Sequence, residues 1–175
     1  MWPWSGSQMR AIQEASEESE KHVHNFERWL GLSAAPGAGR VAAVNLSSFR
    51  VTTGAAANGF GDAVQLLGVS DTPQQTGKTH FDLHRIHITN VETNALTYRL
   101  RIAFALSGES SYAAAVANGH YTEVCFKVDQ TNADSTPVPI MSEYCPVGIK
   151  AWAAVAHAAA DAKWVEFLFG IHEYD

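Results

Sequence analysis

The stretch that decides the fold class is residues 80–106, HFDLHRIHITNVETNALTYRLRIAFAL. From Thr97 to Leu106 its apolar and polar side chains alternate, which places one set on each face of a β-strand. His80–Val91 alternates too, but the phase changes at His84-Arg85, as is typical of a β-bulge. The short polar link Glu92–Ala95 between the two runs predicts a hairpin. We therefore expect a mainly β protein.

The same spacing continues on both sides of this stretch. Further candidate strands are Ala63–Val69, Tyr121–Asp129, Ile140–Tyr144, Ile149–His157 and Trp164–Glu173. Short turns join them, with Gln130–Pro139 as a longer polar connection, and strands do not alternate regularly with helices. Residues 63–175 are therefore expected to form an antiparallel β-sandwich or jelly-roll-like domain. Ala151–Ala160 also suits a helix on propensity, although the flanking strands favour a strand, and Ser110–Gly119 suits either a brief helix or a loop.

An apolar ladder precedes that domain. Its positions step by three and four, which is a heptad pattern, and they are Met9, Ile12, Ser16, Ser19, Val23, Phe26 and Leu30. Gly31 follows as a stop signal, so we predict an α-helix within residues 1–31. Residues 32–62 are rich in Gly and Ala and lack periodicity, which predicts an extended arm or linker. The expected organisation is an anchor helix (1–31), an arm (32–62) and a β-domain (63–175).

The N-terminal residues predict contact with a partner. A short helix with one apolar stripe cannot bury that stripe by itself, so it must dock on its own domain, on further copies or on a larger assembly. Trp2 and Trp4 flank Pro3 ahead of the helix, and we expect them to insert into a pocket of a partner or of their own domain. The predicted partner-binding residues are Trp2, Trp4, Met9, Ile12, Val23, Phe26 and Leu30.

Composition argues against several classes of protein. The net charge is −6 and no basic stripe is present, so direct nucleic-acid binding is not expected. No apolar run approaches the ~20 residues that cross a bilayer, so no membrane role is expected. The start MWPWSGSQ does not resemble a signal peptide, which predicts a cytosolic origin. Cys125 and Cys145 lie in separate candidate strands without zinc-site spacing, and whether they pair is left open.

The best candidate for chemistry is His80-x-Asp82-x-His84. Alternate residues of a strand share a face, so these three side chains could approach one zinc or iron ion. An ordinary polar strand face has the same pattern, and alternate side chains lie about 6.6 Å apart, which is wide for one ion. The chain has no GxSxG motif, and the glycine-rich Gly54–Gly61 lacks the ending of a phosphate-binding loop. We predict a non-enzymatic protein without catalytic residues or cofactor; a metal-dependent jelly-roll enzyme is the alternative from another class.

Three segments carry a resemblance to a known class of proteins. They are HRIHITNVETNALTYRLRIAFAL (84–106), GHYTEVCFKVD (119–129) and KAWAAVAHAAADAKWVEFLFGIHEYD (150–175). These segments resemble small structural proteins of tailed-bacteriophage particles, in which a β-domain ends in a strand like Gly170–Tyr174 here.

The resemblance implies a virion structural role without catalytic residues. The most specific expectation is a capsid cement (decoration) protein that bridges capsid subunits, assembled in the host cytoplasm and located in the virion. Its partner would be the major capsid protein or another virion protein, and its own state a homotrimer. A tail or head fibre component with a short coiled-coil stem is an alternative. A sugar-binding β-sandwich is another, and it would need exposed aromatic side chains around one groove.

Overall fold

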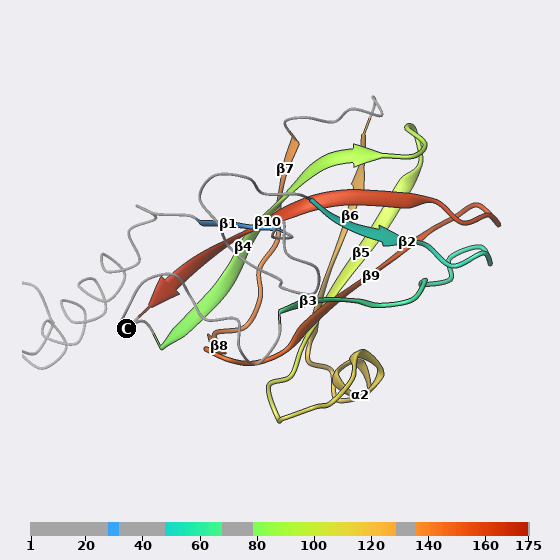
Figure 1. Cartoon of the computed structure of the whole chain (residues 1–175). Coiled ribbons are helices and arrows are strands. Elements are labelled where there is room, and N and C mark those ends of the chain that lie inside the picture. Colours follow the sequence, from blue (N-terminus) through green and yellow to red (C-terminus); the bar gives the residue numbers. More distant parts are fainter. Residues whose placement is uncertain (1–27, 32–47, 68–78, 129–135, 175) are drawn as a thin grey trace, which may run out of the picture.

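The computed structural model describes residues 28–31, 48–67, 79–128 and 136–174 (Figure 1). The described chain is mainly β. Its strands are β1 (Arg28–Leu30), β2 (Phe49–Thr52), β3 (Val64–Leu67), β4 (His80–Val91), β5 (Thr97–Phe104), β6 (Tyr121–Lys127), β7 (Thr136–Pro139), β8 (Cys145–Pro146), β9 (Ala151–His157) and β10 (Trp164–Tyr174). One short helix, α2 (Tyr112–Ala117), lies between β5 and β6. No helix in these ranges is long and apolar enough to cross a membrane.

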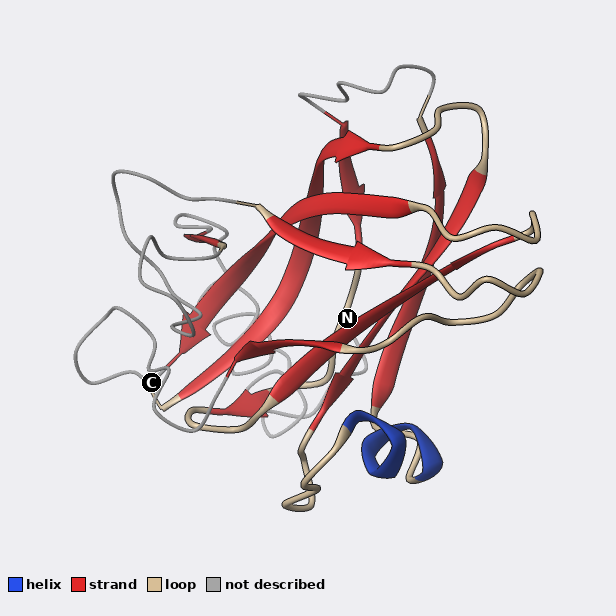
Figure 2. Ribbon diagram, turned by 45° about the vertical axis from the view of Figure 1, so that its right-hand side comes forward, coloured by secondary structure: helices blue, strands red, loops and turns tan. Residues whose placement is uncertain are grey.

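The strands form two antiparallel sheets. In the six-stranded sheet, β10 and β4 lie side by side at the centre. On the side of β10 away from β4, β1 and β2 pair with different stretches of β10. On the side of β4 away from β10, β7 and β8 pair with different stretches of β4. The four-stranded sheet has the order β3-β9-β5-β6. Figure 2 shows both sheets, with α2 at one end of the molecule.

One apolar core joins the two sheets. The alternation along each strand directs one set of side chains inward, and the fully buried members come from both sheets. The largest are Tyr98, Phe49, Phe167, Leu66, Leu83, Ile86, Ile88, Leu100 and Ile102. All seven residues of β9 are buried, so it lies covered on both faces, and its small alanines suit that position. The strand that we favoured over a helix for this segment is confirmed.

The segment 80–106 has the two predicted strands, and the bulge is confirmed. Gly170 of β10 pairs with Arg85 and Ile171 pairs with Leu83, so His84 is the extra residue in β4. The link Glu92–Ala95 is short, as predicted, but it does not close a hairpin. β4 belongs to the six-stranded sheet and β5 to the four-stranded one, so the link carries the chain from one sheet to the other. Alternation identifies strands but does not say which sheet each one joins.

Three boundaries predicted from the sequence are wrong. Arg28–Leu30 is a strand on β10, so no helix extends to Leu30; the rest of the predicted anchor helix lies outside the described residues. β2 lies within the predicted arm 32–62, which means that the paired sheet begins before Ala63. The strand predicted at Ile140–Tyr144 is irregular chain, and the pairing segment is Thr136–Pro139 immediately before it. Two prolines in β7 concealed it, because proline normally marks an edge or the end of a strand.

Candidate functional site

Most of the predicted partner-binding residues lie outside the described ranges. These are Trp2, Trp4, Met9, Ile12, Val23 and Phe26. Leu30 is described, and its side chain is only 2% exposed within the core of its own domain. Leu30 is therefore part of the fold, and it is unavailable to a partner while β1 is paired.

The three metal-site candidates lie along one polar face of β4, but different neighbours hold them. His80 shares a 2.9 Å hydrogen bond with the Thr79 hydroxyl, and its ring stacks on Tyr144 at 4.4 Å between centroids. The Asp82 carboxylate accepts a 2.9 Å hydrogen bond from Tyr174, and the His84 ring lies 4.3 Å from that of His172. Within the part of the chain that the structure describes, no three His, Cys, Asp or Glu side chains are placed to hold a metal ion.

Asp82 is the electrostatic centre of this polar face. Its Oδ1 lies 3.7 Å from Nδ1 of His172, and its Oδ2 accepts from Tyr174. Burial, followed by the bond to the negative Asp82, raises the pKa of Tyr174 above its usual range, so the phenol keeps its proton and donates. The sequence could not show this cluster, because His172 and Tyr174 come from β10, far from β4 along the chain.

A groove opens between the start of β6 and the irregular segment 140–144. Its volume is about 270 Å³, and the residues lining it are Phe104, Leu106, His120, Tyr121, Thr122, Met141, Ser142 and Glu143. The large hydrophobic residues that stay exposed among the described residues are Tyr121 (42%), Met141 (82%) and Tyr144 (51%). Two of these line the groove, and Tyr144 directly follows Glu143, so exposed apolar surface gathers at this place.

A buried carboxylate holds His120 at the groove. Glu109 precedes α2 while Asn118 and His120 follow it, so the helix brings the three side chains together. The Glu109 carboxylate accepts bonds from Asn118 (2.9 Å), from the Ser107 backbone N–H (2.8 Å) and from Nδ1 of His120 (2.6 Å). The Asn118 bond and the other donors outweigh burial and lower the pKa of Glu109 to about 2. An ionised carboxylate only accepts, so Nδ1 carries the proton and Nε2 is left for other contacts.

On the outer face of the four-stranded sheet, two arginines bind one glutamate. Nε and Nη2 of Arg99 donate to Oε1 of Glu123 at 3.0 and 2.7 Å, and Nε of Arg101 donates to Oε2 at 2.9 Å. The Arg101 guanidinium also lies 4.1 Å from the centre of the Phe60 ring. Burial alone would raise the pKa of Glu123, but the two arginines lower it. Both arginines are thus paired within their own sheet.

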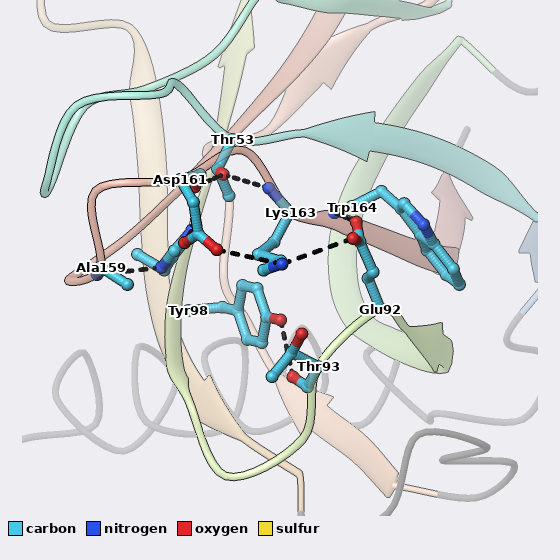
Figure 3. Close-up of polar contacts among 9 residues, drawn as sticks. Thr53, Glu92, Thr93, Tyr98, Ala159, Asp161, Lys163 and Trp164 are labelled. Carbon is cyan, nitrogen blue, oxygen red and sulfur yellow. Dashed lines mark hydrogen bonds and ion pairs between the residues drawn. The ribbon is translucent and has the colours of Figure 1, made fainter.

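A polar network lies near the start of β5, at the other end of this strand from the groove (Figure 3). The Thr53 hydroxyl accepts a 2.8 Å hydrogen bond from the Lys163 N–H, and the Lys163 ammonium lies 3.0 Å from Asp161 and 3.5 Å from Glu92. The Tyr98 hydroxyl donates to the Thr93 carbonyl at 2.7 Å. These contacts tie together the connections after β2, β4 and β9. Their role is to fasten three loops, since each charge has an oppositely charged partner.

The two cysteines are free and lie in different sheets. Cys125 is exposed on β6, whereas Cys145 is buried on β8. Burial raises the pKa of Cys145 to about 12, so this thiol is unreactive at neutral pH. Cys125 is the thiol that an external reagent would meet first.

Comparison with known proteins identifies no relative of this chain. No protein-family model, no curated protein and no solved structure matches it.

Proposed function

We propose that this protein is a non-enzymatic structural protein of a tailed-phage virion, most specifically a capsid cement protein. The observation that carries the proposal is the pairing order of the strands. Taking β2–β7, β9 and β10 as eight strands, the first pairs with the last, β3 with β9, β4 with β7, and β5 with β6. This order is that of a long hairpin folded over on itself, the jelly roll, which recurs in viral capsid and lectin domains. The resemblance of residues 84–106, 119–129 and 150–175 to phage structural proteins supports the same function.

The mechanism is attachment by burial of surface at several points. β1 pairs with β10, so a partner held by Trp2 and Trp4 would be tethered to the β-domain by the chain that leads to β1. Several attachment points on one body raise retention far above that of each contact alone. We propose the major capsid protein as the partner and a homotrimer as the state that bridges neighbouring subunits.

The test uses a truncation that the fold itself defines. Removing residues 1–27 keeps β1 and the core, whereas removing 1–31 would also delete a strand. We expect both the full chain and the 1–27 deletion to fold, and only the full chain to bind shells assembled from the capsid protein of the same phage and to raise their disassembly temperature. Light scattering on both proteins measures the oligomeric state. Failure of the folded full-length protein to bind such shells would refute the proposal.

The groove supports a second candidate function, the binding of a saccharide. A sugar-binding β-sandwich requires exposed aromatic residues at one groove, and Tyr121 lines the groove while Tyr144 lies next to it. His120 and Glu143 also line the groove and add polar side chains that suit sugar hydroxyls. A glycan array would test this candidate, with His120→Ala and Tyr121→Ala as weakened variants and Tyr98→Phe, at the far end of the molecule, as the control.

A metal assay separates the structural function from the enzyme alternative. Purified full-length protein would be analysed for bound zinc and iron, alongside the His84→Ala variant. Stoichiometric metal that is lost in His84→Ala would favour the jelly-roll enzyme. We expect no such stoichiometric metal.

A further inference from the structure

Among the residues that the structure describes, β6 lies at the edge of the four-stranded sheet and leaves one edge of its backbone unpaired. Among the described strands it pairs only with β5. The hydrogen bond from the Phe104 N–H to the His120 carbonyl fixes the alternation of the ladder. Tyr121, Glu123, Cys125 and Lys127 therefore direct their backbone N–H and C=O groups away from β5. Such a row of donors and acceptors is a template for another strand.

We propose that two copies of this chain join through β6, antiparallel and centred on Cys125, so that the two four-stranded sheets become one; this two-fold contact is separate from the one that would build the proposed homotrimer. In this register Cys125 faces the partner's Cys125, and Glu123 faces the partner's Lys127. On the inner face, Val124 meets the partner's Phe126. Opposite charges and a β-branched residue against an aromatic ring are both favourable cross-strand pairs. The sequence of β6, YTEVCFK, is thus complementary to itself.

Charge favours this register over those centred nearer to Glu123. In an available register, residues whose backbone N–H and C=O groups point outward lie opposite one another in the two copies. The centre of the pairing can therefore move only in steps of whole residues. Centring on Glu123 would place the two Glu123 carboxylates against each other. Centring on Val124 would place Glu123 opposite the partner's Cys125 and leave the charge of Lys127 without its counterpart. The register centred on Cys125 instead gives the alternating row Arg101, Glu123 and the partner's Lys127, since Glu123 already binds Arg101.

Exposure is consistent with an open edge at these positions. Cys125 and Lys127 are exposed, and Val124 is half-buried at the rim of the core. Pairing would cover Val124 and satisfy the outward backbone groups of both copies. The opposing expectation is that the charges on an edge strand guard it against pairing, as they do in many sheets.

The native thiol provides the test. Full-length protein would be treated with diamide, which accepts the two electrons released when two thiols form a disulfide, and then run on a non-reducing gel. We expect a Cys125-linked dimer, because paired residues across antiparallel strands lie within disulfide range. Cys125→Ser should abolish the dimer. Cys145→Ser should leave it unchanged, since Cys145 is buried.

A displaced thiol controls for random collision. Thr97 is exposed on β5, one strand in from the edge, so Thr97→Cys combined with Cys125→Ser keeps one accessible thiol per chain away from the proposed contact. This variant should crosslink at least tenfold more slowly than the wild type. Equal rates for the two proteins, or no dimer in the wild type, would overturn the proposal.

A charge reversal tests the register. Lys127→Glu would place a second carboxylate opposite the partner's Glu123 at two symmetric positions, and we expect about a tenfold lower yield of dimer. Lys150→Glu makes the same change in net charge away from β6 and should crosslink like the wild type. Unchanged crosslinking in Lys127→Glu would show that the two copies do not meet in this register.

Discussion

The central strands of the two sheets, β5 and β4, solve the same packing problem differently. β5 pairs with β6 and with β9 without any shift of register. β4 pairs with β10 through two register shifts, one of them at His84. Both strands direct an alternating apolar set into the shared core. The difference therefore lies in how their outer faces are arranged.

The regular strand pairs both of its arginines, whereas the irregular one leaves individual buried polar atoms without a hydrogen bond. Along β5 and β6 the unbroken ladder places Arg99 and Arg101 where both reach Glu123. Along β4 the bulge redirects the chain, and Oδ1 of Asp82 and Nε2 of His87 are buried without a hydrogen bond. A bulge bends its strand, and these unbonded polar atoms lie on the strand that carries it. We expect the pairing of the Arg99, Arg101 and Glu123 charges to depend on the regular register of β5 and β6, and the four predictions below compare the two strands and their outer faces.

The largest effect is expected from deleting one residue of the regular strand. Removing Arg101 would invert the faces of half of β5, so that Tyr98 and Leu100 or Ile102 and Phe104 would turn out of the core. We expect loss of the folded state, a cost of more than about 5 kcal/mol. Circular dichroism during urea titration measures it. A cooperative unfolding transition in this variant would show that register matters less than we infer.

Deleting the bulge residue should be tolerated. Without His84, Leu83 and Arg85 become neighbours and still pair with Ile171 and Gly170, while the inward and outward positions on either side are kept. We expect a folded protein that loses about 2 kcal/mol of unfolding free energy, since the curvature and the His84–His172 contact are lost. His84→Ala, which keeps the bulge, is the matched control and should cost less than the deletion. If the deletion variant does not fold, the bulge is required for folding.

A smaller effect is expected from neutralising one carboxylate on each outer face. Glu123→Gln leaves two arginines with a weaker acceptor, and we expect a loss of about 1 kcal/mol after allowance for partial exposure. Glu166→Gln on β10 removes the partner of Arg50 alone, which is more than half exposed, and should cost about half as much or less. Urea unfolding at low salt compares the two. Equal losses would mean that the double arginine contact adds nothing.

The smallest effect expected is the pH dependence of the difference in unfolding free energy between the wild type and Glu123→Gln. Because the pKa of Glu123 is lowered in the folded protein, its contribution is present above the ordinary carboxyl pKa of 4.5 and is lost as the pH falls below it. The gap in stability between wild type and Glu123→Gln should therefore narrow between pH 5 and pH 3. Urea midpoints at these two values and at pH 7 check it. A gap that widens in acid would contradict the sign of the shift.

The sequence predicts strands, which depend on neighbouring residues along the chain. It does not predict which strands pair, because that depends on how the chain is arranged in space. Alternation was enough to predict β4, β5 and the bulge at His84-Arg85, whereas β9 was favoured because the elements on either side of it are strands. Alternation could not tell that Glu92–Ala95 crosses between sheets, because a short polar link suits both a hairpin and a crossing. β1 was missed because three residues are too few to show a period of two.

For the candidate sites too, the sequence shows the residues of one strand but not their contacts with other segments. The polar face of β4 was visible in the sequence, but its partners on β10 were not. The groove was missed altogether, since it depends on segment 140–144 being irregular and lying against the start of β6. Glu109 and His120 gave no signal, because only the turn of α2 brings them together. Pairing of Arg99 and Arg101 with Glu123 required knowing that β5 and β6 are in contact.

The shortness of β1 has a mechanical consequence. Its three residues hold to β10 by only a few hydrogen bonds, so a pull on the N-terminal segment would open this strand long before the body unfolds. Once β1 has come away, residues 28–48, which precede β2, can be drawn out to at most about 75 Å. β1 would then act as a weak link that yields under load and lengthens the tether, while β2 and the core stay intact.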